Sequence, residues 1–210
     1  MIIDFKKTQK DLYQPGAKPS FIDVPEMIFI MVDGKGDPNT GEAYQSALGA
    51  LYGLAYAVKM SKMGASQLKG YFDFVVPPLE GLWWTDSGEY EPGKTDKGEM
   101  LWTSMIRMPK FVTPEAFETV KEALAKKKPE LDTSIARLET FNEGLCAQVM
   151  HTGPYDDEPA TIQALKAFID DSGYKLDLSD TRRHHELYMN DPRKTPVERL
   201  KTIIRYPIKK

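Results

Sequence analysis

Hydrophobic residues along the chain follow strand-like and helix-like periods in turn. Apolar runs of strand length, continuous or alternating, occur at residues 27–32, 71–76, 81–85, 100–108, 135–141, 145–151, 184–189 and 200–208. Apolar residues at helical spacing predict amphipathic helices over about residues 39–63, 113–128 and 156–171. We expect residues 1–25 to form an extended arm along the body, and residues 86–99 to form a loop or hairpin tip. This mixture of elements predicts an α+β fold.

The order of these elements repeats once. A strand, a glycine-containing break, a helix and two further strands run from about Met27 to Thr85, and again from about Leu145 to Tyr206. We therefore expect one domain over residues 1–210. Its halves would span about 20–110 and 135–208, joined by a connecting helix at about 113–128. Two such units could meet across a pseudo-twofold axis and leave a central ligand cleft between them.

Turn residues separate the strands within each half. Asn142, Glu143 and Gly144 have the composition of a hairpin turn between the strands at 135–141 and 145–151. Asn190, Asp191 and Pro192 are turn residues between the last two strands, which predicts that these strands pair.

The strand at residues 184–189 carries the most informative polar pattern. Its alternation places His184, Glu186 and Tyr188 on one face. A carboxylate in mid-strand costs free energy if that face belongs to the core, and is understandable if the face lines a cleft. The alternatives are that Glu186 is a surface carboxylate or the buried partner of Arg205 or Lys201.

Composition limits the classes of function. The chain has 41% hydrophobic and 28% charged residues and a net charge of −3, with both signs interspersed, so nothing favours nucleic-acid binding. The single cysteine, Cys146, lies in an apolar run, which predicts a core residue and fits a reducing cytoplasm. No signal-peptide pattern and no apolar run of membrane-spanning length is found in the sequence, so we expect no membrane association.

Four short motifs resemble the GyrI-like small-molecule-binding family, which includes the effector domains of multidrug-responsive transcription activators. They are HTGPY at 151–155 before a helix, HELY at 185–188 on a strand, NDP at 190–192, and KT at 201–202 running on to YPI at 206–208. The segment 72–84, FDFVVPPLEGLWW, resembles the stand-alone branch of the family. The resemblance covers roughly residues 20–208, and no helix-turn-helix pattern precedes residue 27.

The resemblance implies a duplicated strand-helix-strand-strand fold and a binding cleft. In the effector domains a buried glutamate at the position matching Glu186 meets cationic aromatic ligands. Some stand-alone members hydrolyse cyclopropane-bearing, DNA-alkylating natural products. The expected partner is therefore a small aromatic or electrophilic molecule, and the expected activity is ring-opening hydrolysis. The alternatives are a protein that binds or sequesters drugs without catalysis, and a gyrase-inhibitor-like interaction protein.

Candidate residues follow from the strand pattern and the resemblance together. Glu186 would act as a general base for water or as a counter-charge, and Tyr155 or Tyr188 would donate a hydrogen bond to an oxygen that gains negative charge. Tyr155 could instead only support packing before its helix. The candidate ligand-binding residues are Trp83, Trp84, Trp102, Phe74, Glu80 and His184.

Several of these candidates also have ordinary structural explanations. Core packing is the default for the three tryptophans, of which at most two can line a cleft. Glu80 could be a turn residue. His184 and His185 point to opposite faces, and neither has a partner at metal-ligand spacing, so we expect no metal. No glycine-rich nucleotide loop is found in the sequence, and we expect no cofactor. The oligomeric state is left open.

Overall fold

A computed structural model of the protein describes residues 2–63, 67–86, 88, 90 and 93–210. Its strands form one antiparallel sheet in the order β1-β6-β9-β8-β3-β4-β2-β5, and β7 pairs with the outer part of β9. The strands are β1 (Ser20–Val24), β2 (Met27–Lys35), β3 (Leu79–Trp84), β4 (Leu101–Met108), β5 (Arg137–Phe141), β6 (Gly144–Thr152), β7 (Lys175–Leu176), β8 (His184–Tyr188) and β9 (Lys201–Lys209).

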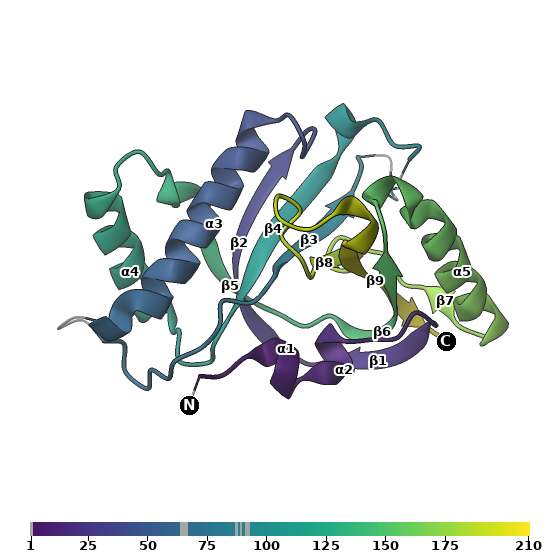
Figure 1. The fold of residues 1–210 in the computed structure, drawn as a ribbon, viewed down its shortest axis with the longest axis horizontal. Helices are drawn as coiled ribbons and strands as arrows, with labels where there is room; N and C mark the ends of the chain where they lie inside the picture. Colours follow the sequence, from purple (N-terminus) through teal and green to yellow (C-terminus); the bar gives the residue numbers. More distant parts are fainter. Residues whose placement is uncertain (1, 64–66, 87, 89, 91–92) are drawn as a thin grey trace.

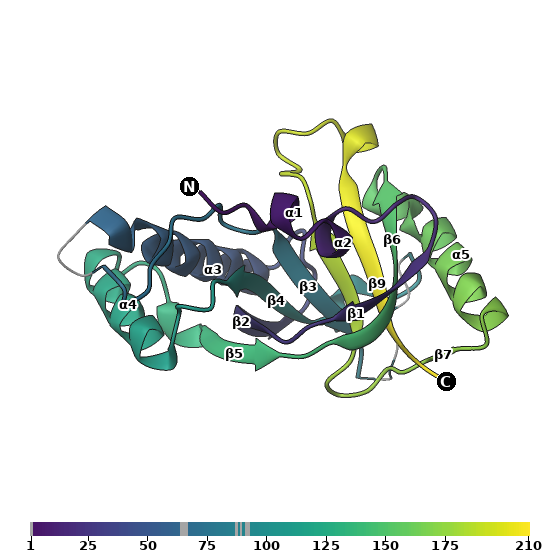
Figure 2. The ribbon, with the colours of Figure 1, turned by 90° about the horizontal axis from the view of Figure 1, so that it is seen from below.

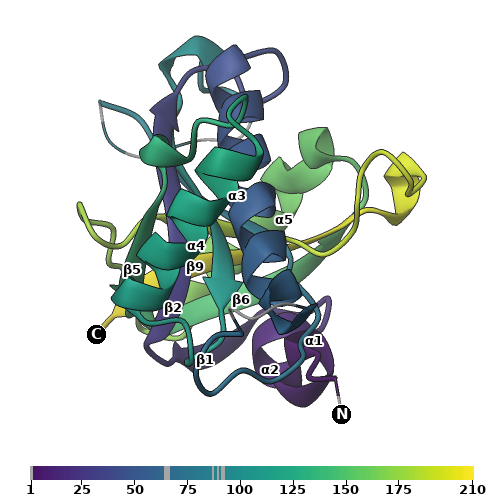
Figure 3. The same ribbon diagram turned by 90° about the vertical axis from the view of Figure 1, so that its left-hand side faces the viewer.

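Three long helices and two short ones accompany the sheet. The helices are α1 (Phe5–Thr8), α2 (Lys10–Tyr13), α3 (Glu42–Met60), α4 (Pro114–Lys127) and α5 (Glu158–Asp171). Figure 1 shows α3 and α5 over opposite ends of the sheet, with β3 and β8 between them, and Figure 3 shows α4 beside α3. The mixture of helices and an antiparallel sheet that the sequence predicts is confirmed. The two-fold relation between the halves stays a prediction.

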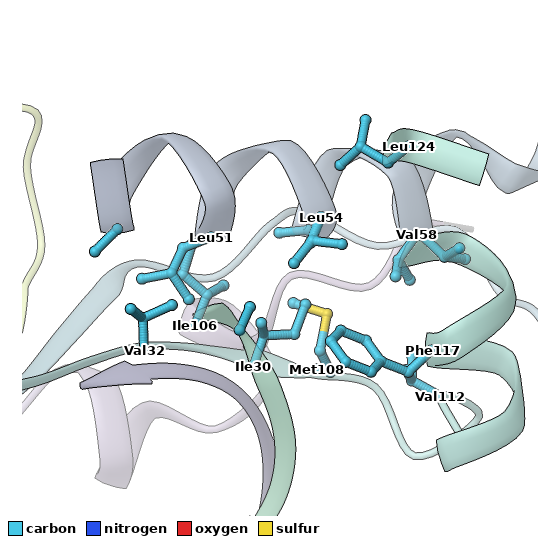
Figure 4. Close-up of a cluster of buried hydrophobic side chains, with 14 of the residues drawn as sticks. Ile30, Val32, Leu51, Leu54, Val58, Ile106, Met108, Val112, Phe117 and Leu124 are labelled. Carbon is cyan, nitrogen blue, oxygen red and sulfur yellow. The ribbon is translucent and has the colours of Figure 1, made fainter. Parts of the chain in front are cut away.

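The larger core lies between α3 and the β2–β4 part of the sheet. Leu51, Leu54 and Val58 lie one or two turns apart on α3 and point at Ile30 and Ile106 (Figure 4). Each of these side chains is fully buried, which contributes about 1.5–3 kcal/mol per side chain to the stability of the fold. Phe117, Val120 and Leu124 of α4 close the far side of the same core.

A second core lies between α5 and the strands β6 and β9. Ile162, Leu165 and Ile169 of α5 pack against Ala147 and Ile204 of the sheet. Ile204 pairs with Glu186 on β8, and Glu186 pairs with Gly81 on β3, so these three residues lie in one row across one face. Because Trp83 on that same face of β3 belongs to the α3 core, α3 and α5 cover one face of the sheet and flank its centre.

The other face is covered by the N-terminal segment (Figure 2). The sequence predicts an extended arm there, but residues 5–13 form α1 and α2, and residues 20–24 form an edge strand on β6. Asp4 caps α1 by accepting a hydrogen bond from the Lys6 N–H, and buried Tyr13 anchors α2. The prediction of an extended arm is therefore wrong for these residues.

Two further local predictions differ from the structure. Residues 71–76 form no strand and make only an isolated bridge, Phe74 to Ile3, so the second and third strands of the first half are β3 and β4. Residues 142–144 do not close a hairpin, because β5 pairs with β2 whereas β6 pairs with β1 and β9. Both errors concern long-range pairing, which local composition does not report. The predicted pairing of the last two strands is confirmed, with Glu186 opposite Ile204.

Candidate functional site

The centre of the sheet holds a buried carboxylate. Glu186 lies in the middle of β8, between β3 and β9, and only 5% of its surface is exposed. His184 and Tyr188 lie on the same face of the strand, as the alternation predicts. Both side chains hydrogen-bond to the Glu186 side chain. Burying a carboxylate without partners costs free energy. The hydrogen bonds of Glu186 therefore determine what the site can do.

Both oxygens of Glu186 are held by hydrogen bonds. Glu186 Oε1 lies 2.7 Å from His184 Nε2, and the Tyr188 hydroxyl donates to Glu186 Oε2 over 2.7 Å. Trp83 Nε1 in turn donates to the Tyr188 hydroxyl over 3.0 Å. An ionised carboxylate only accepts hydrogen bonds, so His184 carries a proton on Nε2 when Glu186 is charged. This chain of donors fixes the orientation of the carboxylate and leaves lone pairs on both of its oxygens.

A glycine opposite Glu186 makes the tryptophan contact possible. Gly81 of β3 pairs directly with Glu186, and a Cβ atom at this position would lie 2.8 Å from Trp83 Nε1. That separation is shorter than any ordinary carbon–nitrogen contact, so a side chain at Gly81 would displace the indole. The absence of a side chain at residue 81 therefore lets the Trp83 N–H reach Tyr188.

Aromatic rings surround the carboxylate. The Tyr155 ring, just before α5, packs edge-on against the Tyr188 ring at 5.9 Å between centroids. From α3, Tyr44 lies 6.1 Å from the Trp83 ring. Tyr90 lies 6.0 Å from Trp83 and 5.4 Å from His184. Such contacts make a wall that suits a flat aromatic ligand.

A small cavity of about 140 Å³ adjoins this cluster. Trp83, Trp84, Tyr90 and His184 contribute to its lining, together with Arg183, whose guanidinium lies 4.8 Å from the Trp84 ring centroid. His184 Nδ1 is buried and has no hydrogen-bond partner among the residues that the structure describes. The cavity thus combines flat aromatic walls with the polar side chains of His184 and Arg183.

A second buried carboxyl group, Glu158, lies at the start of α5. Only 2% of its surface is exposed, and it continues the buried stripe of Ile162, Leu165 and Ile169 by one turn. Burial first, and then the charge of Glu186, raise the pKa of Glu158 to about 10. Glu158 is therefore a neutral acid at pH 7, close enough to Glu186 for the two charges to interact.

Burial and the nearby carboxyl groups also keep the tyrosines protonated. Burial, with the charge of Glu186 next, raises the pKa of Tyr188 well above its ordinary value. Burial, with Glu158 and Glu186 next, raises the pKa of Tyr155 to about 12. Both phenols can therefore act as hydrogen-bond donors at neutral pH. The proton of Tyr188 is already directed at Glu186, whereas Tyr155 is 37% exposed and faces the edge of the cluster.

Glu80 lies on the opposite face of the sheet, away from Glu186. Glu80 Oε2 lies 3.1 Å from His185 Nε2, and the other ring nitrogen of His185 lies 3.0 Å from Glu143 Oε1. Arg205 donates from Nη1 to Glu143 over 2.9 Å, so it is the partner of Glu143 and not of Glu186. This buried ionic network also holds the N-terminal segment, because Arg205 Nη2 donates to the Leu12 carbonyl.

The remaining predicted ligand-binding residues lie either beside the Glu186 cluster or away from it. Trp102 is 1% exposed and lies behind Tyr44, with 5.0 Å between ring centroids, and its ring fits there because Gly34 has no side chain. Phe74 is fully buried in the α3 core beside Phe111, away from the Glu186 cluster. The predicted residues that the structure brings together at the site are Glu186, Tyr188, Tyr155, His184 and Trp83. Trp84 lines the adjoining cavity. Trp102, Phe74 and Glu80 lie outside the site.

Sequence reasoning missed three residues of the cluster. The sequence around Glu158 is typical of an acidic helix start. Its helical spacing with Ile162, Leu165 and Ile169, however, predicts that Glu158 is buried. Tyr44 reads as a core residue of its helix. Tyr90 lies in a polar loop, where nothing in the pattern distinguishes it.

In the part of the chain that the structure describes, no group of three or more His, Cys, Asp or Glu side chains is arranged to hold a metal ion. Nor does any described helix combine the length and apolar character needed to cross a bilayer.

Comparisons with known proteins agree with this architecture. The family model of the GyrI-like small molecule binding domain matches residues 17–209. A crystal structure of a hydrolase from Listeria innocua shares 49% identity, with a TM-score of 0.90 and coverage of 99% of this chain and 100% of the other. An uncharacterized conserved protein from the same organism shares 51% identity, with a TM-score of 0.93 and the same coverage.

More distant similarity concerns the fold alone. The C-terminal domain of EcmrR has 14% identity and a TM-score of 0.55, with coverage of 92% of this chain and 98% of that domain. No curated protein sequence matches the chain significantly.

Proposed function

Because the chain belongs to the GyrI-like family of small-molecule-binding domains, we propose that it hydrolyses electrophilic cyclopropane-bearing aromatic genotoxins. The observation that carries this proposal is Glu186, a buried carboxylate whose two oxygens are oriented by His184 and Tyr188 inside an aromatic cluster. The similarity to a hydrolase from Listeria innocua supports an enzymatic role. Detoxification within the cytoplasm is the biological setting that we propose.

The substrate that fits this chemistry is a cyclopropane conjugated to a dienone. Glu186 takes a proton from water, and the water oxygen attacks the ring CH₂ carbon. The ring C–C bond breaks, and its electron pair moves through the dienone onto the carbonyl oxygen, which becomes a phenol oxygen after gaining a proton. The product is a ring-opened alcohol, so water is added and nothing is oxidised or reduced. Assistance by a positioned general base contributes on the order of 10²–10⁴-fold to the rate.

A two-half architecture is the second part of the proposal. The order β2-β4-β3 in one half is matched by β6-β9-β8 in the other, and the two triplets meet at β3 and β8. Glu186 and Gly81 lie at that junction. A duplicated unit with a pseudo-twofold axis near this pair would place the ligand between α3 and α5, where Tyr44 and Tyr155 face each other across the site.

The alternative function is binding without catalysis. A carboxylate among the rings of Tyr44, Trp83 and Tyr90 is also suited to a flat aromatic cation, since both the charge and the ring faces attract it. A protein of this kind would protect a cell by sequestering such molecules.

The change Glu186→Gln separates the two functions, because it keeps the shape of the side chain and removes the basic oxygen. Turnover of a neutral cyclopropane dienone, followed by mass spectrometry of the water-added product, should fall by at least about a hundredfold with little change in binding. Glu198→Gln, on an exposed residue of the β8–β9 connection, is the matched control and should leave turnover unchanged.

The same variant has a second readout in tryptophan fluorescence. If Glu186 is only a counter-charge, Glu186→Gln should weaken a flat cationic ligand by roughly 1–3 kcal/mol and leave a neutral one untouched. Stoichiometric protection of the dienone by the wild-type protein, without turnover, would reject hydrolysis in favour of sequestration. A variant that hydrolyses and binds both ligands as the wild type does would remove Glu186 from the site.

A further inference from the structure

We propose that Glu158 is the catalytic acid of this site, which protonates the substrate's carbonyl oxygen while Glu186 takes a proton from water. This inference rests on the proposed hydrolysis and identifies a residue that neither the motifs nor the strand pattern single out. It turns a one-carboxylate site into a pair of carboxyl groups with opposite tasks.

The packing of α5 directs Glu158 to the site. Ile162 and Leu165 pack on the face of β9 that carries Ile204, and Ile204 pairs with Glu186. Glu158 lies one turn earlier on the same stripe of α5 and directly follows the turn Tyr155–Asp157. Because the Tyr155 ring contacts the Tyr188 ring, the start of α5 borders the Glu186 cluster.

The Glu158 carboxyl group is buried but not fully satisfied. Its Oε1 atom is inaccessible to solvent and has no hydrogen-bond partner among the described residues, although the Thr202 hydroxyl, which is also buried and unpaired, lies near enough to lower the pKa of Glu158. Buried polar atoms are nearly always paired in proteins, so an exception at a site calls for an explanation. A substrate oxygen placed between α5 and β8 would supply the missing partner.

The electrostatic setting keeps the proton on Glu158. Burial and the Glu186 charge raise the pKa of Glu158 to about 10, so it is protonated at neutral pH. Glu115 occupies the comparable first turn of α4 but is exposed, and its pKa is lowered, first by a hydrogen bond from its own backbone N–H and then by Thr113. The comparison shows that the helix N-terminus is not what makes Glu158 an acid.

Glu158 is a better proton donor than either tyrosine. The Tyr188 proton is committed to Glu186 Oε2. The pKa of Tyr155 is about 12 and its ring is partly exposed, whereas the pKa of Glu158 is closer to neutrality. An acid is more effective when its pKa lies nearer the working pH, so Glu158 transfers its proton more readily. Tyr155 then serves as a wall of the site.

The proton balance closes within the pair. During ring opening Glu158 loses a proton to the carbonyl oxygen and becomes a carboxylate, while Glu186 gains one from water. After product release, a proton moves from Glu186 to Glu158, directly or through a water molecule, and restores the starting state. Each cycle consumes one water and leaves the protein unchanged.

The main test compares Glu158→Gln with Glu115→Gln. Glutamine keeps the size of the side chain but has no transferable acid proton, so kcat should fall at least about a hundredfold at pH 7 while KM changes little. Wild-type kcat should also decline as the pH rises through about 10, and the residual activity of Glu158→Gln should lack that decline. Glu158→Asp, which keeps an acid proton, should recover part of the activity, and Glu115→Gln should behave as wild type.

Infrared difference spectroscopy in H₂O and D₂O provides a readout that does not need a substrate. At pH 7 the wild-type protein should show the carbonyl band of a protonated carboxyl group, which is lost in Glu158→Gln and kept in Glu115→Gln. If the band is absent from the wild type, the inference is overturned whether or not the protein is a hydrolase. If Glu158→Gln turns over with wild-type kcat and pH profile, the acid role is overturned while hydrolysis stands.

The failure of the proposed function itself has a different signature. A wild-type protein that shows the carboxyl band but does not turn over the dienone rejects hydrolysis, and the catalytic role of Glu158 falls with it. Near-UV circular dichroism of each variant checks that the aromatic cluster is intact. If Glu158→Gln does not fold, the comparison is made between Glu158→Asp and the wild-type pH profile.

Discussion

Single residues set the geometry of the site through a few close contacts. Trp83 donates to Tyr188 and Tyr188 donates to Glu186, and the first of these hydrogen bonds depends on the space above Gly81. The roles of the two glutamates also differ by local environment only. Glu186 accepts two hydrogen bonds, whereas Glu158 is left with an unpaired buried oxygen. Under the proposed mechanism, the same side-chain chemistry would supply a base and an acid within one site.

The change Gly81→Ala should disturb the site more than the fold. Its methyl group would meet the Trp83 indole at 2.8 Å, so the ring must move and its hydrogen bond to Tyr188 must lengthen or break. We expect a loss of about 1–3 kcal/mol in the free energy of unfolding, as for overpacking in a core. Turnover or ligand binding should fall at least about tenfold, since misplacement near 1 Å is costly for a site.

Urea unfolding and ligand titration measure these two effects. Gly98→Ala is the control, because residue 98 lies in an exposed turn where a methyl group would meet only ordinary contacts. Unchanged turnover and unchanged Trp83 fluorescence in Gly81→Ala would contradict the proposed dependence on this contact.

Individual elements carry the site because their packing fixes where each polar side chain lies. Helix α5 uses Ile162, Leu165 and Ile169 to bind the sheet and places Glu158 at the start of that stripe. Strand β8 presents Glu186 on one face and His185 on the other. Helix α3 packs most of one side against β2 and β4, and Tyr44 at its beginning reaches the tryptophans. The position of each functional group thus follows from the packing of its element.

The core contact of α3 should dominate its contribution to stability. Leu54 is fully buried between the helix and the sheet, so Leu54→Ala removes buried carbon atoms and leaves a cavity that α3 cannot close. We expect the free energy of unfolding to fall by about 2–5 kcal/mol. Tyr56→Ala, two residues along the helix at a side chain that is 51% exposed, should change it by about 0.5 kcal/mol or less. Equal effects in urea unfolding would contradict the assigned core.

The whole molecule is held together on its second face by an ionic network. His185 contacts Glu80 and Glu143, and Arg205 joins Glu143 to the N-terminal segment. Burial alone would lower the pKa of His185, but the charge of Glu143 and the hydrogen bonds of both glutamates raise it to about 9. Burial alone would raise the pKa of Glu143, but His185 and Arg205 lower it to about 2. The network therefore combines strands from both halves of the sheet with the N-terminal segment.

This network makes stability depend on pH in a defined direction. The pKa of His185 is raised from 6.5 to about 9, so its stabilisation is complete below pH 6.5 and is lost as the pH rises through about 9. A shift of this size corresponds to about 3 kcal/mol. The raised pKa of Glu158 adds a fall in the same direction, starting at its ordinary value of 4.5. The lowered pKa of Glu143 gives stability above pH 4.5 that is lost as the pH falls through about 2.

Urea unfolding at several pH values checks this prediction. The wild-type free energy of unfolding should fall between pH 6.5 and 9, whereas His185→Gln should be less stable at pH 6 and show a smaller fall. Glu80 and Glu143 are the titratable groups that face His185, and Arg205 in turn pairs with Glu143. Equal slopes for both proteins over that range would show that His185 does not carry the effect.

Local patterns in the sequence determined most of the helices and strands and the faces of the polar residues on β8. The alternation of β8 placed His184, Glu186 and Tyr188 together, and the turn residues before β9 predicted the pairing of these two strands. The burial of Cys146 also follows from its apolar neighbours. These features depend on residues close in the chain, where the two-residue period of a strand and the chemistry of a turn leave few choices.

Only the tertiary structure decided which elements meet. The neighbours of Glu186 come from β3, from the segment before α5 and from α5 itself, and their contacts depend on the pairing of β3 with β8. The same pairing put Glu80 beside His185 on the other face. Residues 71–76 form no strand because Phe74 makes only an isolated bridge to Ile3. Strand partners are chosen by packing and long-range hydrogen bonds, which no local period records. The approach of Glu158 to Glu186 is therefore a property of the folded protein and not of any one motif.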